Sequence, residues 1–556
     1  MSETSEHLVA GTVQAGGTPV QTAARAGLFT RQSSGLVREI GIVMATAIAL
    51  ASVALPLTFI NFNAGLTSFS QVDFYIPLLG GAFIWFVAMF AYRYLVQAIP
   101  RAGGEYVFLT RAVSPMVGAI AGVGTLFNFI YVLAVNCHFF ASYTPFMLTG
   151  LGDAFNSSSI ANAANHVTSE GAIAAISVGV MLVVAAASVL SLKRLAQVIV
   201  AFVILQVVVL LVLGVLLIDH SHADFVTAFG RFSHHPGAYQ ATISAAKASG
   251  IAFGVSIAAL LATIPFMVVN YNGVLYSYYV GGELRRPSRT YLYASAISIG
   301  VLVLLWGGLW ILLRHTAGLN FMQAQANLGN SDPTTYAKIS SLNSAAGGLG
   351  YGLALSGDPI TKILIATAVP LAALAVNLAF LAVTTRVLFA LAFDRLLPVS
   401  VARVSERNHS PVNAIIIVLI VAIGFCLLLA FVSISNIVAL QSLFYGLVLL
   451  AGGTAAVFIA YTRPELVKRP GATDVARWMG VPIVTWAGAA TVLLALFVVV
   501  EVVSHPNAYG KFSVESTLTL VIVLAAGPVL YVIARARRKR TDSLDLDMAM
   551  RELPPE

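Results

Sequence analysis

The side chains best placed to do chemistry in this sequence interrupt a long apolar stretch, residues 250–289. A proline, a glycine and polar residues break the pattern near its middle: Pro265, Asn270, Tyr271, Asn272 and Gly273. In hydrocarbon, backbone that leaves the helix is tolerated only where it is buried in protein or lines a cavity. The ends of such half-helices can hold ions and the charged groups of a small ligand. The stretch therefore predicts a broken helix around a binding site.

The composition indicates what must surround this break. Of the 556 residues, 58% are hydrophobic and only 10% are charged, whereas ordinary soluble domains carry about 25% charged residues. Apolar runs of about 20 residues, long enough to cross a bilayer as helices, recur along the chain. The sequence therefore predicts an all-α polytopic protein of the lipid bilayer with about 12 transmembrane helices, and excludes a soluble globular chain.

The formal net charge of +8 could indicate a nucleic-acid partner, but the placement of the charges argues against one. When loops are assigned alternately to two sides, 25 of the 31 Lys and Arg residues fall on one side. The other side holds the remaining six: Arg231, Lys247, Arg314, Lys338, Lys362 and Lys511. By the positive-inside rule the richer side is cytoplasmic. We expect a multi-pass protein of the cell (cytoplasmic) membrane with both termini in the cytoplasm and no nucleic-acid partner.

The first apolar stretch also carries residues that permit a helix to open. Ala49, Ala51 and Ser52 are small, and Pro56 follows them. Small residues and proline let a backbone unwind and approach a ligand. Small residues also serve simply to pack membrane helices closely together. Taken alone, this stretch leaves both interpretations open.

Histidines are further candidates for chemistry. His138, in the third apolar stretch, could relay a proton or contact a substrate, or it could be a packing residue bonded by a neighbour. A loop after the fifth apolar stretch holds four more: His220, His222, His234 and His235. Their spacing fits no metal-ligand pattern. We therefore expect a solvated loop, no metal site and no resident cofactor.

Three loops carry motifs with a distinctive order of residues. The first is the run PRAGGEYVFLTRAVSP, residues 100–115. The second follows the broken stretch and consists of Glu283, Arg285, Arg286, Pro287 and Arg289. The third consists of Arg386, Asp394, Leu397, Pro398 and Pro411. Together they resemble the amino acid, polyamine and organocation (APC) permease superfamily, and the resemblance extends from the first to about the tenth apolar stretch.

This resemblance implies a five-plus-five inverted repeat in which helices 1 and 6 are broken. It also implies a secondary active transporter of amino acids that works by alternating access, and not an enzyme. Residues 1–35 are then a disordered cytoplasmic tail, and residues 36–461 hold the transport core, spans 1–10. Residues 481–537 form spans 11 and 12, and residues 538–556 form a second cytoplasmic tail.

A zwitterionic amino acid suits two facing breaks, because helix amino ends favour a carboxylate and carbonyl ends favour an ammonium group. We assign the carboxylate to the backbone near three small residues: Ala49, Ala51 and Ser52. The ammonium group is assigned to carbonyls of residues 270–273. The family has a glycine at the break of helix 6, and counting back from Glu283 places it at Gly273. The side chains that we expect to contribute to selectivity flank that glycine: Tyr271, Asn272 and Tyr276.

The coupling ion stays open between Na⁺, H⁺ and neither. In proton-coupled members of the family a lysine of the fifth helix takes the place of a sodium ion, and here that position falls on Gln206. The hydroxyls of Thr384 and Thr385 could bind Na⁺ beside carbonyls of the first span, or they could donate to their own helix instead. His138 leaves coupling to a proton open. Obligate exchange of substrates needs neither ion.

Charged residues on the cytoplasmic side could form an inner gate that breaks when the site opens inward. The candidates are chosen because their loops are assigned to the cytoplasmic side and because they carry charges of opposite sign: Glu105, Glu283, Arg285 and Asp394. An inner gate of opposite charges would couple the opening of a cytoplasmic path to the separation of ion pairs.

Other functions remain as alternatives. Within transporters, the substrate could be an amine or another small metabolite that is exchanged. In other classes the chain could be a channel or a sensor-like membrane protein. A channel would need a continuous polar pore or rings of charge, and no such ring is visible in the sequence. A monomer and a homodimer fit the sequence equally well.

Overall fold

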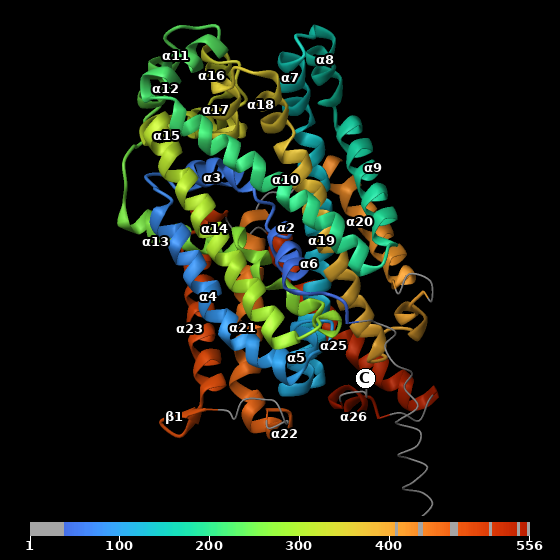
Figure 1. Cartoon of the computed structure of the whole chain (residues 1–556). Helices are drawn as coiled ribbons and strands as arrows, with labels where there is room; N and C mark the ends of the chain where they lie inside the picture. The colour runs from blue at the N-terminus through green and yellow to red at the C-terminus, as the bar shows by residue number, and fades with distance from the viewer. Residues whose placement is uncertain are drawn as a thin grey trace, which may run out of the picture.

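The computed structural model describes most of the chain: residues 38–405, 410–431, 437–467, 476–510, 514–541 and 545–552. Almost every element in these ranges is a helix (Figure 1). Two short strands in the described residues pair as a hairpin, β1 (Arg477–Trp478) and β2 (Val481–Pro482). The predicted all-α class is confirmed. The predicted tail of residues 1–35 and part of the predicted C-terminal tail lie outside the described residues.

Eleven helices in the described ranges are long and apolar enough to cross a membrane. Ten of them are α4 (Tyr75–Ala98), α6 (Pro115–Ser142), α9 (Glu170–Ser188), α10 (Leu192–Asp219), α14 (Pro287–Ala317), α19 (Ala368–Phe393), α20 (Val412–Phe431), α21 (Ile437–Thr462), α23 (Ile483–Ser504) and α25 (Val514–Thr541). The eleventh is the continuous helical stretch Ile257–Tyr279, which joins α13 (Ile257–Asn270) to the 3₁₀ helix η2 (Asn272–Tyr279). The first predicted span is instead divided between α2 (Ile42–Ala51) and α3 (Leu57–Ser68). Neither half is long enough to be counted as a membrane-spanning helix by itself. The 11 long helices together with this divided first span therefore agree with the prediction of about 12 spans. The inverted repeat stays a prediction.

Shorter helices gather at the two ends of the bundle (Figure 1). The end drawn at the top, called the upper end below, carries α7 (Thr144–Ala154), α8 (Ser158–Ala163), α11 (His222–Phe232), α12 (Ala238–Ala248), α16 (Pro333–Ile339), α17 (Gly347–Leu355) and α18 (Pro359–Ala366). The opposite, lower end carries α5 (Glu105–Ala112), α22 (Pro464–Val467) and α26 (Leu546–Arg551). Further short elements are η1 (Ala164–Val167), α15 (Leu319–Ser331), η4 (Ser344–Ala346), η5 (Val399–Ala402) and α24 (Pro506–Tyr509).

The basic residues divide between these two ends as the loop assignment predicted. Residues of the smaller set lie on upper-end helices α11, α12, α16 and α18: Arg231, Lys247, Lys338 and Lys362. Residues of the larger set, such as Arg111 in α5 and Arg551 in α26, lie at the lower end. These four residues of the smaller set thus lie at the end opposite to the two examples of the larger set, and Lys511 lies outside the described residues.

Helix α19 forms the centre of the bundle. Its apolar window is 94% buried, whereas the corresponding windows of α20 and α23 are 28% buried and that of α25 is 17% buried. The outer helices present large apolar side chains to the surroundings, for example Leu304 on α14 and Leu493 on α23. An apolar outer surface of this kind is what a chain surrounded by lipid requires. Spans 11 and 12 thus pack around a core that is centred on α19.

Two glycines let α21 and α23 approach closely. A Cβ added at Gly488 would lie 2.7 Å from the carbonyl oxygen of Gly453, and one added at Gly453 would lie 3.0 Å from that of Gly488. Small residues commonly take such positions between membrane helices, because association there depends on close packing of the two backbones.

Replacing Gly488 with Leu should separate α21 from α23 and lower the free energy of unfolding by about 1–3 kcal/mol, the usual cost of overpacking. Thermal unfolding of the purified full-length protein in detergent would measure this loss. Gly308→Leu is the matched control, because Gly308 is exposed on α14 and no atom lies within 4 Å of its added Cβ. Equal melting temperatures for the two variants would contradict the packing described here.

Candidate functional site

The first apolar stretch leaves the helix between Ala51, the last residue of α2, and Leu57, the first residue of α3. Within this interruption Ala54 has a φ of 54°, in the left-handed region that non-glycine residues rarely adopt. The Nε1 of Trp306, on α14, donates to the carbonyl of Leu55 at 3.2 Å. The interruption is therefore held by a neighbouring helix, as buried backbone polar groups require.

The sixth apolar stretch changes its helix type at Tyr271. Helix α13 ends at Asn270, and the chain continues as the 3₁₀ helices η2 (Asn272–Tyr279) and η3 (Gly281–Glu283). Pro265 lies inside α13 without ending it. A 3₁₀ segment has poorer hydrogen-bond geometry than an α-helix and is usually short, so eight residues of it mark a place of strain or of movement.

The two altered segments touch at Gly273. A Cβ added there would lie 2.5 Å from Cβ of Ser52, 2.7 Å from the carbonyl carbon of Ser52 and 3.0 Å from the carbonyl oxygen of Ala49. Approach at this distance is open only to glycine, because any side chain would force the segments apart. The structure thus brings Gly273 together with Ala49 and Ser52, three residues that the sequence assigned to one site. Ala51, also assigned, is fully buried at the end of α2.

Side chains join the same two stretches on either side of this contact. The Nδ2 of Asn61, on α3, donates to Oδ1 of Asn270 at 2.8 Å. Tyr276 is buried, packs against the rings of Phe129 and Phe380, and donates to the hydroxyl of Tyr445 at 3.4 Å. Tyr276 therefore connects η2 to α6, α19 and α21.

Several buried polar atoms beside the contact have no hydrogen-bond partner in the described structure. They are the hydroxyls of Tyr271 and Ser277, Oδ1 of Asn272 and Oε1 of Gln206. Tyr271 packs on Trp306 at 5.0 Å between ring centroids, and Gln206 lies on α10, which packs against α2 and α19. Burying a polar atom without a partner costs about 1–3 kcal/mol. These atoms are therefore suited to bind a polar ligand or water.

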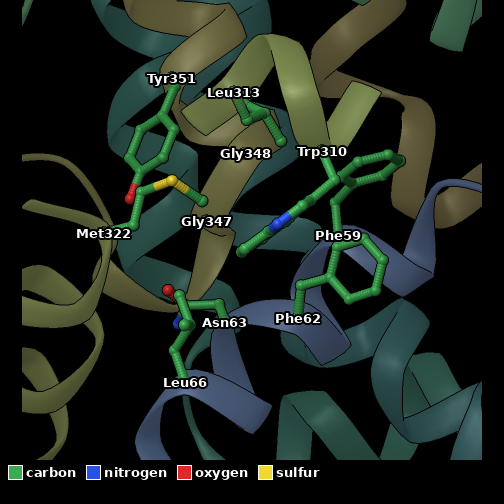
Figure 2. Close-up of a pocket in the computed structure, with 10 residues that line it drawn as sticks. All are labelled: Phe59, Phe62, Asn63, Leu66, Trp310, Leu313, Met322, Gly347, Gly348 and Tyr351. Atoms are coloured by element: carbon green, nitrogen blue, oxygen red, sulfur yellow. The ribbon is translucent and has the colours of Figure 1, made fainter. Parts of the chain in front are cut away.

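The upper end is hollowed above this contact. A hollow of ≈ 340 Å³ is lined mainly by α3, α15 and residues around η4, and it includes Asn63, Thr67 and Tyr143. A second, narrow cavity of ≈ 10 Å³, the size of one water, lies between α3, α14, α15 and α17 and is also lined by Asn63. Figure 2 shows Trp310 and the two phenylalanines Phe59 and Phe62 on one side of it and Met322 and Tyr351 on the other. Asn63 Oδ1 has no partner.

The lower end is closed by buried ion pairs. Arg386, on α19, pairs with Glu283 of η3 at 2.9 Å. Arg111, on α5, makes two bonds to Asp394, of 2.6 and 2.9 Å, and Asp394 also accepts from the hydroxyl of Tyr106 at 2.8 Å. The four charged side chains are each at most 5% exposed. Two of the predicted gate residues, Glu283 and Asp394, therefore lie in ion pairs that join helices at the lower end.

Glu105, a third predicted gate residue, is bound by tyrosines instead of by a basic residue. Its Oε1 accepts from Tyr92 at 2.7 Å and also from Tyr278, and its Oε2 accepts from Tyr279 at 2.6 Å. Glu105 is 1% exposed. It lies in α5, outside the candidate spans. Burial raises the pKa of its carboxyl group, and the three phenol hydrogen bonds oppose that increase.

The other predicted site residues lie away from the contact or are engaged elsewhere. His138 is half-buried four residues before the end of α6, and its Nδ1 is unpaired. The hydroxyls of Thr384 and Thr385 donate to their own helix, at Phe380 and Leu381. The side chain of Arg285 is exposed, and Glu283 is paired by Arg386. The threonine geometry is the one expected if these hydroxyls bond their own helix.

Sequence reasoning missed residues that the structure places beside the site. Asn61 and Asn63 break the apolar pattern of the first stretch and could have been found as polar residues within a predicted span. Arg386 was matched to a motif but had no predicted partner. Tyr92 and Tyr278 carry no sequence signal of their own, because aromatic residues are common in membrane helices and only the fold brings these two to Glu105.

We expect the Arg386–Glu283 pair to show strong coupling in stability. Arg386→Gln leaves a buried carboxylate without its partner and should lower the free energy of unfolding by about 3–5 kcal/mol. Adding Glu283→Gln removes that charge and should restore part of the loss. Thermal unfolding in detergent measures the stability of the single and the double variant. Lys362→Gln is the control, because the more exposed Lys362–Asp153 pair should contribute about 1 kcal/mol or less to the free energy of unfolding. Additive effects of the two substitutions would contradict this pairing.

Comparison with known families identifies the family of this chain. The family described as amino acid permease matches residues 40–527, a range that contains both altered stretches and every predicted site residue. Comparison with curated proteins gives no match. Because the family match spans most of the chain and the fold is a bundle of apolar helices, this protein belongs to the amino acid permease family, whose members are membrane transporters of small molecules.

Proposed function

We propose that the protein is a secondary active transporter of amino acids that works by alternating access across the cytoplasmic membrane. In this proposal the lower end, which carries most of the basic residues, faces the cytoplasm. The observation that carries the proposal is the contact of Gly273 with Ser52 and Ala49, because it places two interruptions of the helical backbone against each other in the interior of the bundle.

The polarity of the helix ends supports a zwitterionic substrate. Helix α3 begins at Leu57 and directs its amino end, which carries partial positive charge, toward the interruption. Helix α13 ends at Asn270 and directs its carboxyl end, which carries partial negative charge, toward the same region. A carboxylate would therefore bind near residues 52–57, at the α3 side of the interruption, and not at Ala49 or Ala51 as the sequence suggested, because these two lie at the carboxyl end of α2. An ammonium group would bind near residues 270–273, with Tyr271 and Asn272 offering further polar atoms.

The difference between the two ends supports alternating access. The hollow at the upper end reaches Asn63, two turns along α3 from the interruption, whereas buried ion pairs close the lower end. Opening the lower end would require Arg386 to leave Glu283, or Arg111 to leave Asp394. Charges that separate in this way must gain water as they part, since an unpaired buried charge is very costly. The ion pairs therefore serve as an inner gate in this proposal.

Uptake into liposomes by the purified full-length protein tests the function directly. A mixed panel of labelled amino acids and amines would be offered under separate gradients of Na⁺, of H⁺ and of internal counter-substrate. We expect saturable uptake of an amino acid. Uptake of amines alone would favour the exchanger of other small metabolites. Unsaturable flux would favour a channel, and no uptake across the panel would contradict the proposed substrate class.

Gly273→Leu should abolish this uptake, at least tenfold below the wild-type rate, because the new side chain fills the space held by Ser52 and Ala49. The rate is measured in the same liposomes, with protein content and orientation matched. Gly308→Leu, on the outer surface of α14, should transport normally. If Gly273→Leu folds, as shown by its melting curve, and transports at the wild-type rate, the site does not lie at this contact.

A further inference from the structure

Glu105 differs from the other buried acidic residues of the described chain. These are Asp73, Glu105, Glu283 and Asp394. Asp73 pairs with Arg314, Glu283 with Arg386 and Asp394 with Arg111, at 2.6–2.9 Å. No Lys, Arg or His of the described residues forms an ion pair with Glu105, whose carboxyl group is hydrogen-bonded by three phenols and by its own backbone amide. A buried carboxylate without a counter-charge is very costly, and such a group commonly becomes neutral instead.

The hydrogen atoms around Glu105 can be counted. Four hydrogen-bond contacts form one network: Tyr92, Tyr278 and Tyr279 each contact Glu105, and the hydroxyl of Tyr92 also lies 3.1 Å from the carbonyl oxygen of Val448. A phenol has a single hydrogen to donate. Three phenols therefore supply three hydrogens for four contacts, and an ionised Glu105 supplies none.

A neutral Glu105 provides the missing hydrogen. In the neutral form the carboxyl O–H would become the donor to the oxygen of Tyr92, which reverses the direction of this bond in the ionised form, and the O–H of Tyr92 would donate to the carbonyl of Val448. Tyr278 and Tyr279 continue to donate to the carboxyl oxygens. All four contacts are then hydrogen bonds, and no unpaired charge is buried.

We propose that Glu105 is a proton-binding site that is occupied while the lower end is closed and is emptied to water when that end opens. On opening, the O–H bond of the carboxyl group breaks, the electron pair stays on the carboxylate, and the proton passes to water that has entered from the lower end. The part of this proposal that concerns transport rests on the proposed function, where it makes H⁺ the ion linked to the cycle.

Glu105 is tied to the segment that must move. Tyr278 and Tyr279 belong to η2 and follow Gly273 by five and six residues. The amide of Gly103 donates to the carbonyl of Tyr279 at 3.2 Å, and Ala102 forms a bridge with Val280. Gly104 has a φ of 60°, and its added Cβ would collide with the rings of Tyr278 and Tyr279. A displacement of η2 relative to α5 would therefore break these backbone contacts and move two of the three phenols away from Glu105.

Other ionisable groups near this network cannot substitute for Glu105. They are Tyr276 and Glu283 from η2 and η3, Tyr291 from α14, Tyr106 and Arg111 from α5 itself, Tyr445 from α21, Arg386 and Asp394 from α19, and Asp547 and Arg551 from α26. Phenols ordinarily titrate near pH 10. The buried Arg111–Asp394 and Arg386–Glu283 pairs carry no net charge, and Asp547 is paired with Arg535.

The sign of the linkage follows from the environment of Glu105 in the closed state. Burial raises the pKa of this carboxyl group there, and water that enters on opening would return the pKa toward its ordinary value of about 4.3. The closed state therefore binds the proton more tightly than the open state. Proton binding therefore stabilises the closed state relative to the open state. This stabilisation is fully present at pH values below the ordinary pKa, and it is lost as the pH rises through the raised pKa of the closed state. Acid should favour closure of the lower end.

Infrared spectroscopy of the purified full-length protein in lipid tests the protonation. We expect a carboxylic acid band at neutral pH that is present in the wild type and absent in Glu105→Gln. Glu501→Gln is the matched control, since Glu501 also lies in an apolar helix but contacts His505, and it should keep the band. Tyr279→Phe removes a donor that favours the ionised form and should raise the midpoint of the band by about one pH unit. A band that persists in Glu105→Gln, or a wild type without one, would overturn the proposal.

Labelling of an introduced cysteine tests the link to opening. Ala102→Cys places a thiol in the closed lower end, and the native Cys137 and Cys426 are buried. The rate of labelling would be compared with and without Glu105→Gln at each pH, so that the pH dependence of thiol chemistry cancels. The amide group of glutamine donates hydrogen bonds at every pH, so Glu105→Gln mimics the protonated carboxyl group. The two rates should match near pH 5, and the protein with Glu105 should label faster at about pH 8, by up to about tenfold.

A rate ratio that does not change with pH would overturn the linkage. Neither measurement uses a substrate, so each tests the proton-binding site independently of whether amino acid uptake is observed. If both succeed and uptake also occurs, a pH gradient should change the rate of uptake in the wild type and should not change it in Glu105→Gln. An equal response of the two proteins to that gradient would contradict the role of Glu105 in transport.

Discussion

The fold depends on one contact, between the backbone around Ser52 and the backbone at Gly273. In a membrane, polar backbone that leaves the helix must be satisfied inside the protein, and here two interruptions meet each other and not lipid. Neighbouring helices complete the arrangement: Trp306 donates to the carbonyl of Leu55, and Asn61 donates to Asn270. Helix α19 fills the centre of the bundle beside them. The long helices thus form a scaffold that holds two short, irregular segments together.

The ends of the bundle use different chemistry around this contact. Small and polar residues line the hollow at the upper end, whereas the lower end is closed by buried charges. Buried ion pairs add little net stability, because the cost of removing water from both ions offsets their attraction. They do make the closed arrangement specific, since either partner alone would be a buried charge. Such pairs suit a contact that has to form and break as a unit.

Glu105 follows a different rule at the same end. It lies among phenols, which can stabilise either a neutral acid or a carboxylate, so its charge state is free to change with its surroundings. Two of the three tyrosines that bind it, Tyr278 and Tyr279, follow Gly273 in the same 3₁₀ helix. Movement at Gly273 and the charge of a carboxyl group are thereby coupled through about 10 Å of 3₁₀ helix. Asp394, by contrast, is paired with the guanidinium group of Arg111.

The all-α membrane class, the family and the stretches where the helices are altered could all be predicted from the amino-acid sequence, as could the division of the loops between two ends. Hydropathy, positive charge, proline and glycine decide these properties locally, and each can be read within one stretch of chain. Only the tertiary structure decided that Gly273 meets Ser52, that Glu283 pairs with Arg386 and not with Arg285, and that three tyrosines surround Glu105. These contacts join residues from 13 to 221 positions apart, and no local pattern specifies which side chains face one another once the helices pack.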